Sequence, residues 1–189
     1  MIIQNKENRE KVASAVHHLL TNNYSQNIFK RLINELLWSA TCDFERKDDI
    51  KYKKKYWSLE AINLREQNIA KGIDRNKGLV HEHTIPRNLI YQKLISLKNP
   101  TYNDVLSIIN EYEYAVVISK REDNMMNSKP HLLRQSLPKG YSINNPASEE
   151  LILSRYIRSR IELFEIDTTT FQIIKPKLTF NDDVGTIHS

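Results

Sequence analysis

The densest chemistry in this sequence lies at His81, Glu82 and His83, where two imidazoles flank one carboxylate. A neutral imidazole can serve as a general base near neutral pH, and a neighbouring carboxylate can hold a divalent ion. Burying charge is costly, so three titratable side chains in a row are rarely tolerated within a buried strand without a reason. Pro86 follows soon afterwards and favours the end of a strand. The cluster therefore indicates a catalytic or metal-binding site near a strand end.

The alternation of side chains along a strand divides this cluster between two faces. His81 and His83 would share one face, and Glu82 would point to the other. A site shared by Glu82 and His83 therefore requires the strand to end or twist there, as Pro86 allows. Two other arrangements stay open. In one, His81 and His83 form a metal pair with Glu82 outside it. In the other, the cluster is structural, with Glu82 paired to an arginine and the histidines capping loops.

The spacing of apolar residues predicts the elements that position this cluster. Apolar residues three and four positions apart indicate a helix over 28–40 and a shorter one over 12–20. Ser58 is a good N-cap for a third helix that continues through Ile69. We therefore expect residues 1–75 to form a helical region that also contains a basic and aromatic segment.

Residues 76–189 change in character and form a second expected region, although the whole chain of 189 residues is also short enough for one compact domain. The elements expected here are a strand over 79–85, a helix over 89–97, a helix capped by Thr101 and Asp104, a strand over 114–118, a helix over 120–127, a helix begun by Asn145 and Pro146, and a β-rich stretch over 168–180. Helices and strands that follow one another in this order predict an α+β fold.

Glu82-His83-Thr84-Ile85-Pro86 resembles the acid-His-…-Pro signature of the HNH nucleases, the His-Me-finger or ββα-metal group. In that family a two-stranded β ribbon is followed by a helix. The acid holds the metal, the histidine after it is the general base, and the helix brings a further ligand. The segment 115–124 is similar to the second strand, the polar turn and the start of that helix. Asn124 falls on the ligand position, with Asp123 and Asn127 as close alternatives.

This resemblance, which covers residues 79–131, implies both a fold and an activity. The fold would be α+β, with N-terminal helices, an elaborated ββα-metal finger, and a C-terminal helix plus β element. The activity would be metal-dependent hydrolysis of phosphodiester bonds in nucleic acid, with DNA favoured over RNA and a role in restriction or phage defence. His83 would be the base and Mg²⁺ (or Mn²⁺) the ion on Glu82 and Asn124. Arg87 would hold a phosphate, or would be a surface arginine before a helix.

The basic character of the chain permits a nucleic-acid partner. The formal net charge is +5. Lys53, Lys54 and Lys55 lie between aromatic residues and would suit a nucleic-acid strand, although the segment could equally be a solvated linker whose tryptophan anchors the next helix. Arg155 and Arg158, with Arg160, have helical spacing and would form either a phosphate-gripping face or a solvated or salt-bridged one.

Several classes of protein are excluded by composition. The lone Cys42 excludes an internal disulfide and a multi-cysteine zinc site. None of the four glycines lies in a phosphate-cradling pattern. No apolar run reaches the roughly 18 residues of a membrane span, and the polar segment 1–6 is unlike a signal peptide, so we expect a cytoplasmic protein without a membrane partner.

Two rival functions remain open alongside the nuclease. One is a non-catalytic nucleic-acid-binding module in which the His-Glu-His cluster is structural or binds metal without turnover. The other is a protein-interaction subunit that docks a partner through its N-terminal helices. A homodimer would suit cleavage of both strands at a symmetric site, and nothing in the sequence requires one.

Overall fold

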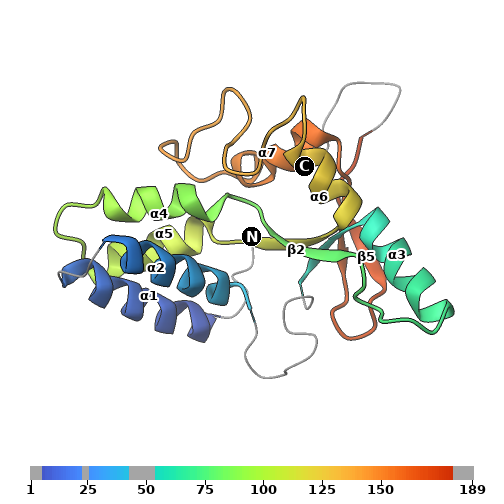
Figure 1. The fold of residues 1–189 in the computed structure, drawn as a ribbon, viewed down its shortest axis with the longest axis horizontal. Helices are drawn as coiled ribbons and strands as arrows, with labels where there is room; N and C mark the ends of the chain where they lie inside the picture. Colours follow the sequence, from blue (N-terminus) through green and yellow to red (C-terminus); the bar gives the residue numbers. More distant parts are fainter. Residues whose placement is uncertain (1–5, 23–25, 43–53, 181–189) are drawn as a thin grey trace.

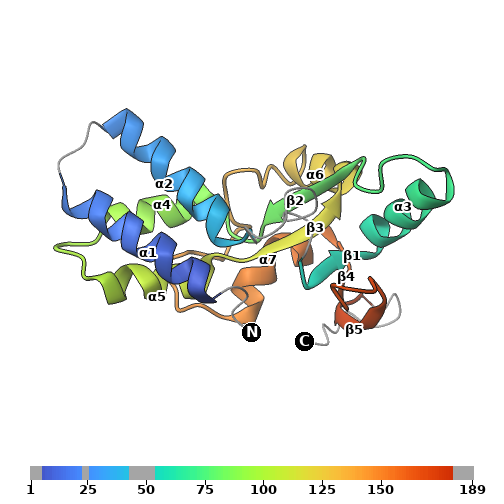
Figure 2. The same ribbon diagram turned by 90° about the horizontal axis from the view of Figure 1, so that it is seen from below.

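The computed structural model describes residues 6–22, 26–42 and 54–180. Within these residues the chain has an α+β fold, with seven helices and one mixed five-stranded sheet, and the N-terminal helices come first (Figure 1). The N-terminal helical bundle lies at one end of the molecule and the sheet with its covering helices at the other (Figures 1 and 2). No helix among the described residues is long and apolar enough to cross a membrane.

The helical bundle is built from four helices that are not consecutive in the sequence. They are α1 (Lys6–Thr21), α2 (Gln26–Ala40), α4 (Arg87–Ile95) and α5 (Tyr102–Tyr112). The α1 helix packs against α2 and α5, and α4 packs against α2 and α5. Their apolar stripes meet in one core that includes Val16, Leu37 and Ile109. The predicted helices over 12–20, 28–40 and 89–97 are therefore confirmed, as is the capping box of Thr101 and Asp104.

The sheet has the strand order β2-β3-β1-β4-β5, which makes β2 an edge strand. Its strands are β1 (Tyr56–Ser58), β2 (Leu79–His83), β3 (Ala115–Ser119), β4 (Leu163–Ile166) and β5 (Ile173–Leu178). The β1–β3 pair is parallel and the other neighbours are antiparallel. The sequence predicted no strand within 1–75, yet β1 lies at the centre of the sheet. The sheet therefore joins the two regions that the sequence separated at residue 75.

Helices cover both faces of the sheet because β3 is apolar on both sides. Val116 and Ile118 pack in one core with residues of α6 (Lys120–Asn127) and α7 (Glu149–Ser159). Val117 points the other way and packs with residues of α3 (Leu59–Ala70), which begins after the predicted cap Ser58. The sheet is thus the middle layer, and all five residues of β3 are buried.

The β2 and β3 strands form an antiparallel pair although α4 and α5 lie between them in sequence. The register sets Leu79 against Ser119 and His83 against Ala115. The α6 helix begins directly after β3, with Ser119 as the N-cap of a capping box completed by Glu122. The two predicted strands and the predicted helix over 120–127 are confirmed, and they form a ββα unit interrupted by a helical hairpin.

The C-terminal part differs in detail from the prediction. The α7 helix starts at Glu149 with Ser148 as its N-cap, and not at Pro146 after Asn145, because the Ser148 hydroxyl accepts from the Leu151 N–H. The β-rich stretch supplies only β5. Its partner β4 comes before the stretch that the sequence marked, and the two form an antiparallel pair.

Candidate functional site

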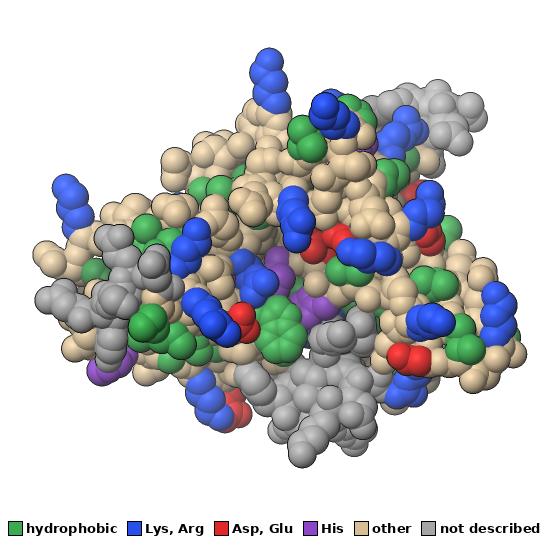
Figure 3. All heavy atoms as spheres, in the orientation of Figure 1, with side chains coloured by type: hydrophobic (Ala, Val, Ile, Leu, Met, Phe, Trp, Pro, Cys, Tyr) green, Lys and Arg blue, Asp and Glu red, His purple; other side chains and the backbone are tan. Residues whose placement is uncertain are grey.

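A hollow of about 410 Å³ lies at the free edge of β2. Because β2 is an edge strand, side chains from both of its faces reach this hollow. Figure 3 shows histidine side chains at the bottom of a depression in the centre of this face, with lysine, arginine and acidic side chains around it. The residues that line it come from α2, β2, α4 and α6 and from the loop after α6: Trp38, Val80, His81, Glu82, His83, Pro86, Arg87, Lys120, Asp123, Asn124, Asn127 and Arg134.

His83, the predicted general base, is a buried residue at the end of β2. Its Nδ1 lies 2.5 Å from Oε1 of Glu113. Its ring stacks on the ring of His81, with centroids 5.1 Å apart and planes 22° from parallel. The two histidines therefore share one face of the strand, as the alternation of side chains predicted. Both ring nitrogens of His83 are buried, and neither makes a hydrogen bond of regular geometry with the described residues.

Glu113, which follows the last residue of α5, was missed by sequence reasoning. Its side chain is fully buried, and neither carboxylate oxygen has a hydrogen-bond partner among the described residues. His83 is the ionisable side chain that this carboxylate contacts. The Arg9 guanidinium donates to the backbone carbonyl of Glu113, so the helix end is held from α1. The sequence signal that could have found it is a charged residue between two aromatic ones, Tyr112 and Tyr114, at the end of a helix.

Burial is the largest cause of the pKa shifts of both His83 and Glu113. It lowers the pKa of His83 well below its usual value, and the positive charge of Arg87 lowers it further. Burial raises the pKa of Glu113, while Arg9 and Arg87 act in the opposite direction. The His83 imidazole is therefore neutral at neutral pH, which is the state a proton acceptor requires.

Glu82, the predicted metal ligand, points to the opposite face from the histidines and meets Arg155 of α7. Nη1 of Arg155 donates to Oε1 of Glu82 at 2.6 Å and to the carbonyl of His83 at 2.8 Å. Burial raises the pKa of Glu82 and Arg155 opposes that shift. Arg155 is fully buried. A buried guanidinium cannot reach a nucleic-acid strand, so Arg155 does not lie on the nucleic-acid-binding face that its helical spacing suggested. Its pairing with Glu82 is the arrangement expected if the His-Glu-His cluster is structural.

The start of α6 brings Asp123 and Asn124 to the same hollow. Asp123 is buried, with Oδ2 2.5 Å from Lys120 Nζ and Oδ1 accepting from the Asn127 amide at 2.6 Å. Asn124 is exposed. The three residues that the sequence offered as alternatives for the helix ligand therefore all line one hollow with Glu82.

These side chains fit a hard divalent ion in their chemistry. Mg²⁺ is usually held by one or two carboxylates together with water and phosphate oxygens. Glu82 uses Oε1 for Arg155, and its Oε2 makes no hydrogen bond with the described residues. Asp123 and Asn124 add oxygen atoms from α6. No group of three or more His, Cys, Asp or Glu residues in the described part of the chain is arranged to hold a metal.

His81, the alternative metal ligand, is engaged with the end of α2. Its Nε2 lies 3.0 Å from the Thr41 hydroxyl, and its Nδ1 lies 3.8 Å from Sγ of Cys42. Cys42 is buried. Both ring nitrogens of His81 thus have neighbours at the end of α2.

Arg87 begins α4 and lines the hollow. Its Nη1 donates to the Asn34 carbonyl at 2.8 Å, which ties the start of α4 to α2. The guanidinium is half-buried and lowers the pKa of His83, so its charge acts directly on the site. It is not a free surface arginine.

The predicted nucleic-acid-binding lysines are placed differently from the expectation. Lys53 lies outside the described residues. Lys54 is buried and donates to the Thr41 carbonyl, and Lys55 pairs with Glu165 at 3.0 Å. Trp57 is fully buried, as the alternative interpretation expects of an anchor, but Lys54 is buried too, so this end of the segment is not a solvated linker.

Arg158 is exposed on α7 but does not line the hollow. The cations around the hollow are instead Arg87, Lys120 and Arg134. Two of these, Lys120 and Arg134, are exposed and were not singled out by the sequence. Lys120 begins α6 and Arg134 lies in the loop after it, so the helical spacing of arginines within α7 could not indicate either residue.

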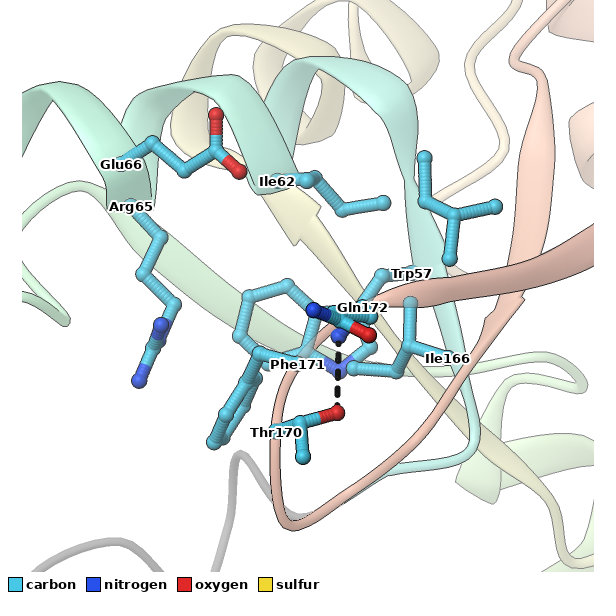
Figure 4. Close-up of a pocket in the computed structure, with 9 residues that line it drawn as sticks. Trp57, Ile62, Arg65, Glu66, Ile166, Thr170, Phe171 and Gln172 are labelled. Atoms are coloured by element: carbon cyan, nitrogen blue, oxygen red, sulfur yellow. Dashed lines mark hydrogen bonds between the residues drawn. The ribbon is translucent and has the colours of Figure 1, made fainter.

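A second hollow, of about 300 Å³, lies between α3 and the β4–β5 turn (Figure 4). Trp57, Ile62 and Ile166 line it, and Phe171 packs edge-on against Trp57 with ring centroids 5.5 Å apart. The Arg65 guanidinium covers the Phe171 ring at 3.6 Å. This hollow contains none of the predicted site residues, and its contacts are those of a packed core edge.

Comparison with protein-family models, with curated proteins and with solved structures finds no match for this chain.

Proposed function

We propose that this chain is a metal-dependent endonuclease that hydrolyses phosphodiester bonds of nucleic acid, with DNA as the favoured substrate and restriction or phage defence as its setting. The observation that carries the proposal is the ββα unit formed by β2, β3 and α6. Its antiparallel strands and following helix bring His83, Glu82 and the Asp123–Asn124 pair around one hollow. This is the arrangement that the HNH resemblance implies for an elaborated ββα-metal finger.

His83 would act as the general base. Its ring is neutral at neutral pH because burial and the nearby cations disfavour the imidazolium. Its Nδ1 faces the Glu113 carboxylate, which leaves Nε2 as the nitrogen that can accept a proton. A water molecule between Nε2 and a phosphorus atom would lose its proton to His83 as it attacks, and general-base assistance of this kind is worth about 10²–10⁴-fold in rate.

Glu82, with Asp123 or Asn124, would hold Mg²⁺ or Mn²⁺. Oxygen donors of this kind suit hard ions, and such an ion, when bound, neutralises charge on the phosphate and its leaving oxygen. Arg155 holds the Glu82 carboxylate in place by its bond to Oε1 and leaves Oε2 toward other partners. The protein therefore fixes the acid before any substrate arrives.

The cations at the rim would grip the nucleic-acid backbone. Lys120 and Arg134 are exposed and Arg87 is half-buried, and all three line the hollow. Phosphate contacts from such side chains position a strand without reading its sequence. Trp38 lines the same hollow and offers an aromatic surface on which a base could stack.

The second candidate is a non-catalytic nucleic-acid-binding module, and two contacts favour it. Glu82 pairs with Arg155, and His81 contacts the end of α2, so part of the His-Glu-His cluster has structural partners. In that case the cluster would stabilise the edge strand, and the rim cations would bind a strand without cutting it.

A nicking assay on supercoiled plasmid, with single-stranded RNA in parallel, separates the two candidates. The native protein and His83→Ala are compared in Mg²⁺, Mn²⁺ or EDTA. The matched control is His18→Ala, which removes an exposed histidine on α1. We expect metal-dependent cleavage that falls at least about 100-fold in His83→Ala and is unchanged in His18→Ala.

Cleavage that survives in His83→Ala would remove His83 from the proposed role. Binding to either nucleic acid without cleavage in any metal would instead favour the non-catalytic module. A binding constant that falls with rising salt would identify phosphate contacts as its basis.

A further inference from the structure

We propose that Glu113 is a positioning residue that holds His83 in one orientation and one tautomer, with the proton on Nδ1 and the lone pair on Nε2. This inference rests on the proposed function, because it assigns a role to Glu113 in the action of His83. It names a residue outside the HNH-like signature, at the end of a helix inserted between the two strands of the ββα unit.

The burial of Glu113 is the first argument. Its side chain has no exposure to solvent, and its carboxylate makes no hydrogen bond with the described residues. An ionisable group in such a place is expensive, since desolvating a carboxylate costs several kcal/mol. A leucine or methionine would fill the same space without that cost. The contact with His83 is the compensating interaction that the structure offers.

The geometry supplies the second argument. Oε1 of Glu113 lies 2.5 Å from Nδ1 of His83, and the ring is also held by its stack on His81. In the ionised form of Glu113, which Arg9 and Arg87 favour and burial opposes, the carboxylate can only accept a hydrogen bond, so the nitrogen that faces it carries the proton. Neither ring nitrogen makes a hydrogen bond of regular geometry with the described residues, and Nδ1 differs from Nε2 in its 2.5 Å approach to the carboxylate. The tautomer of an imidazole is set by the bond that its other nitrogen makes.

Glu113 is itself fixed from two directions. Arg9 of α1 donates to its backbone carbonyl and to the carbonyl of Ile109 one helical turn earlier. On the strand side, the Thr84 N–H donates to the Tyr114 carbonyl at 2.9 Å. The end of α5 is thereby joined both to the bundle and to β2, so the carboxylate keeps its place relative to the imidazole.

Nitrogen-15 NMR of the imidazoles tests the tautomer without any need for activity. The full chain is labelled, and the His83 signals are assigned by comparison with His83→Gln among the six histidines. We expect native His83 to show a protonated Nδ1 and an unprotonated Nε2. Glu113→Met, which has nearly the same length and no charge, should lose this single tautomer. Glu111→Met, at an exposed position of α5, is the matched control and should keep it.

Cleavage kinetics on the same variants test the consequence. In Glu113→Met we expect kcat to fall by about 100-fold or more while KM stays within about threefold, because the loss is in proton transfer and not in binding. Glu111→Met should match the native protein in both. If Glu113→Met does not fold, Glu113→Gln replaces it. An amide both donates and accepts, so this variant should show a mixture of tautomers and a reduced kcat.

A native His83 that carries its proton on Nε2 would overturn the inference. So would a tautomer and a kcat that stay unchanged in the Glu113 variants. If the native protein cleaves nothing, the nuclease proposal fails. In that event an Nδ1 proton that depends on Glu113 would still support the positioning of His83 by Glu113, so the two failures are distinguishable.

Discussion

Glu82 of β2 and Arg155 of α7 form an ion pair across the edge of the sheet, with 2.6 Å between Oε1 and Nη1. The arginine side chain is almost completely buried and the carboxylate is 19% exposed. The same guanidinium nitrogen donates to the His83 carbonyl. One buried cation therefore holds both the acidic side chain and the backbone of the residue proposed as the base.

This pair predicts a large stability loss when one partner is removed. Arg155→Met should lower the free energy of unfolding by about 3–5 kcal/mol, because it leaves the Glu82 carboxylate without its cation. Glu82→Leu combined with Arg155→Met should lie much closer to the native protein. Urea unfolding followed by circular dichroism measures both. A loss below about 1 kcal/mol in Arg155→Met would contradict a buried ion pair here.

The rim cations predict where nucleic acid binds. In a His83→Ala background, Arg134→Gln should weaken duplex binding for all sequences alike and reduce the slope of log K against log salt by about 0.9, the value for one lost phosphate contact. Arg158→Gln is the matched comparison, since Arg158 is exposed but lies outside the hollow. Fluorescence anisotropy over a salt series measures both. A larger effect of Arg158→Gln would place the binding face on α7.

Replacing Gly78, just before β2, should lower the free energy of unfolding. Its φ is +80°, and a Cβ there would meet Cδ2 of Leu64 at 3.1 Å. Its carbonyl accepts from the Lys120 N–H at 2.7 Å, so the same residue links β2 to α6. Gly78→Ala should cost more than the roughly 1–2 kcal/mol of a left-handed alanine alone.

The matched control for this substitution is Gly72→Ala. Gly72 also has a positive φ, of +66°, but a Cβ there would meet nothing within 4 Å. Its cost should therefore stay near the backbone term, and Gly78→Ala should exceed it in thermal unfolding. Equal losses in the two variants would show that Leu64 moves aside freely.

Glu60 predicts a pH dependence of stability. Its carboxylate accepts from Nε of Arg121 at 2.9 Å and from the Ser119 hydroxyl at 2.7 Å. The Arg121 bond is the main reason that the pKa of Glu60 is lowered from 4.5. A lowered pKa contributes stability above the unfolded value, and that contribution disappears as the pH falls through the folded value.

Glu60→Gln should therefore be less stable than the native protein at pH 7, by about 0.5–1 kcal/mol because the pair is partly exposed. The difference should shrink as the pH falls below 4.5, the unfolded value. Urea unfolding of both proteins over this pH range measures it. A difference that stays constant down to pH 3 would show that the loss is one of packing.

The helices could be predicted from the sequence because their signals are local. Apolar residues recur along α1 and α2 at helical spacing, and Thr101 and Ser58 cap the helices that follow them. The β2 and β3 strands were also visible as short apolar runs. The central strand β1 was not, because its three residues gain their character only from pairing with β3 and β4.

The candidate site was predictable only in the residues that carry their own chemistry. His83, Glu82 and Asp123 line one hollow, and whether they act there stays a prediction. Arg155 was offered as a nucleic-acid-binding residue, with a salt-bridged face as the alternative, because helical spacing does not show which side of a helix is buried. Glu113 was missed because its importance comes from one contact with a residue on a distant strand. Both errors concern charges whose partners are far away in sequence.

The helical hairpin between β2 and β3 has a consequence for the order of folding. The two strands pair along their whole length, yet residues 84–114 separate them. Closing so long a loop costs chain entropy, and this cost slows the pairing of the two strands when nothing else holds them together. Once α4 packs on α5, the two chain ends of that loop are held near each other and the remaining search is short. We therefore expect the packing of α4 and α5 in the bundle core around Ile109 to shorten the search by which the edge strand, and with it the histidine cluster, assembles during refolding.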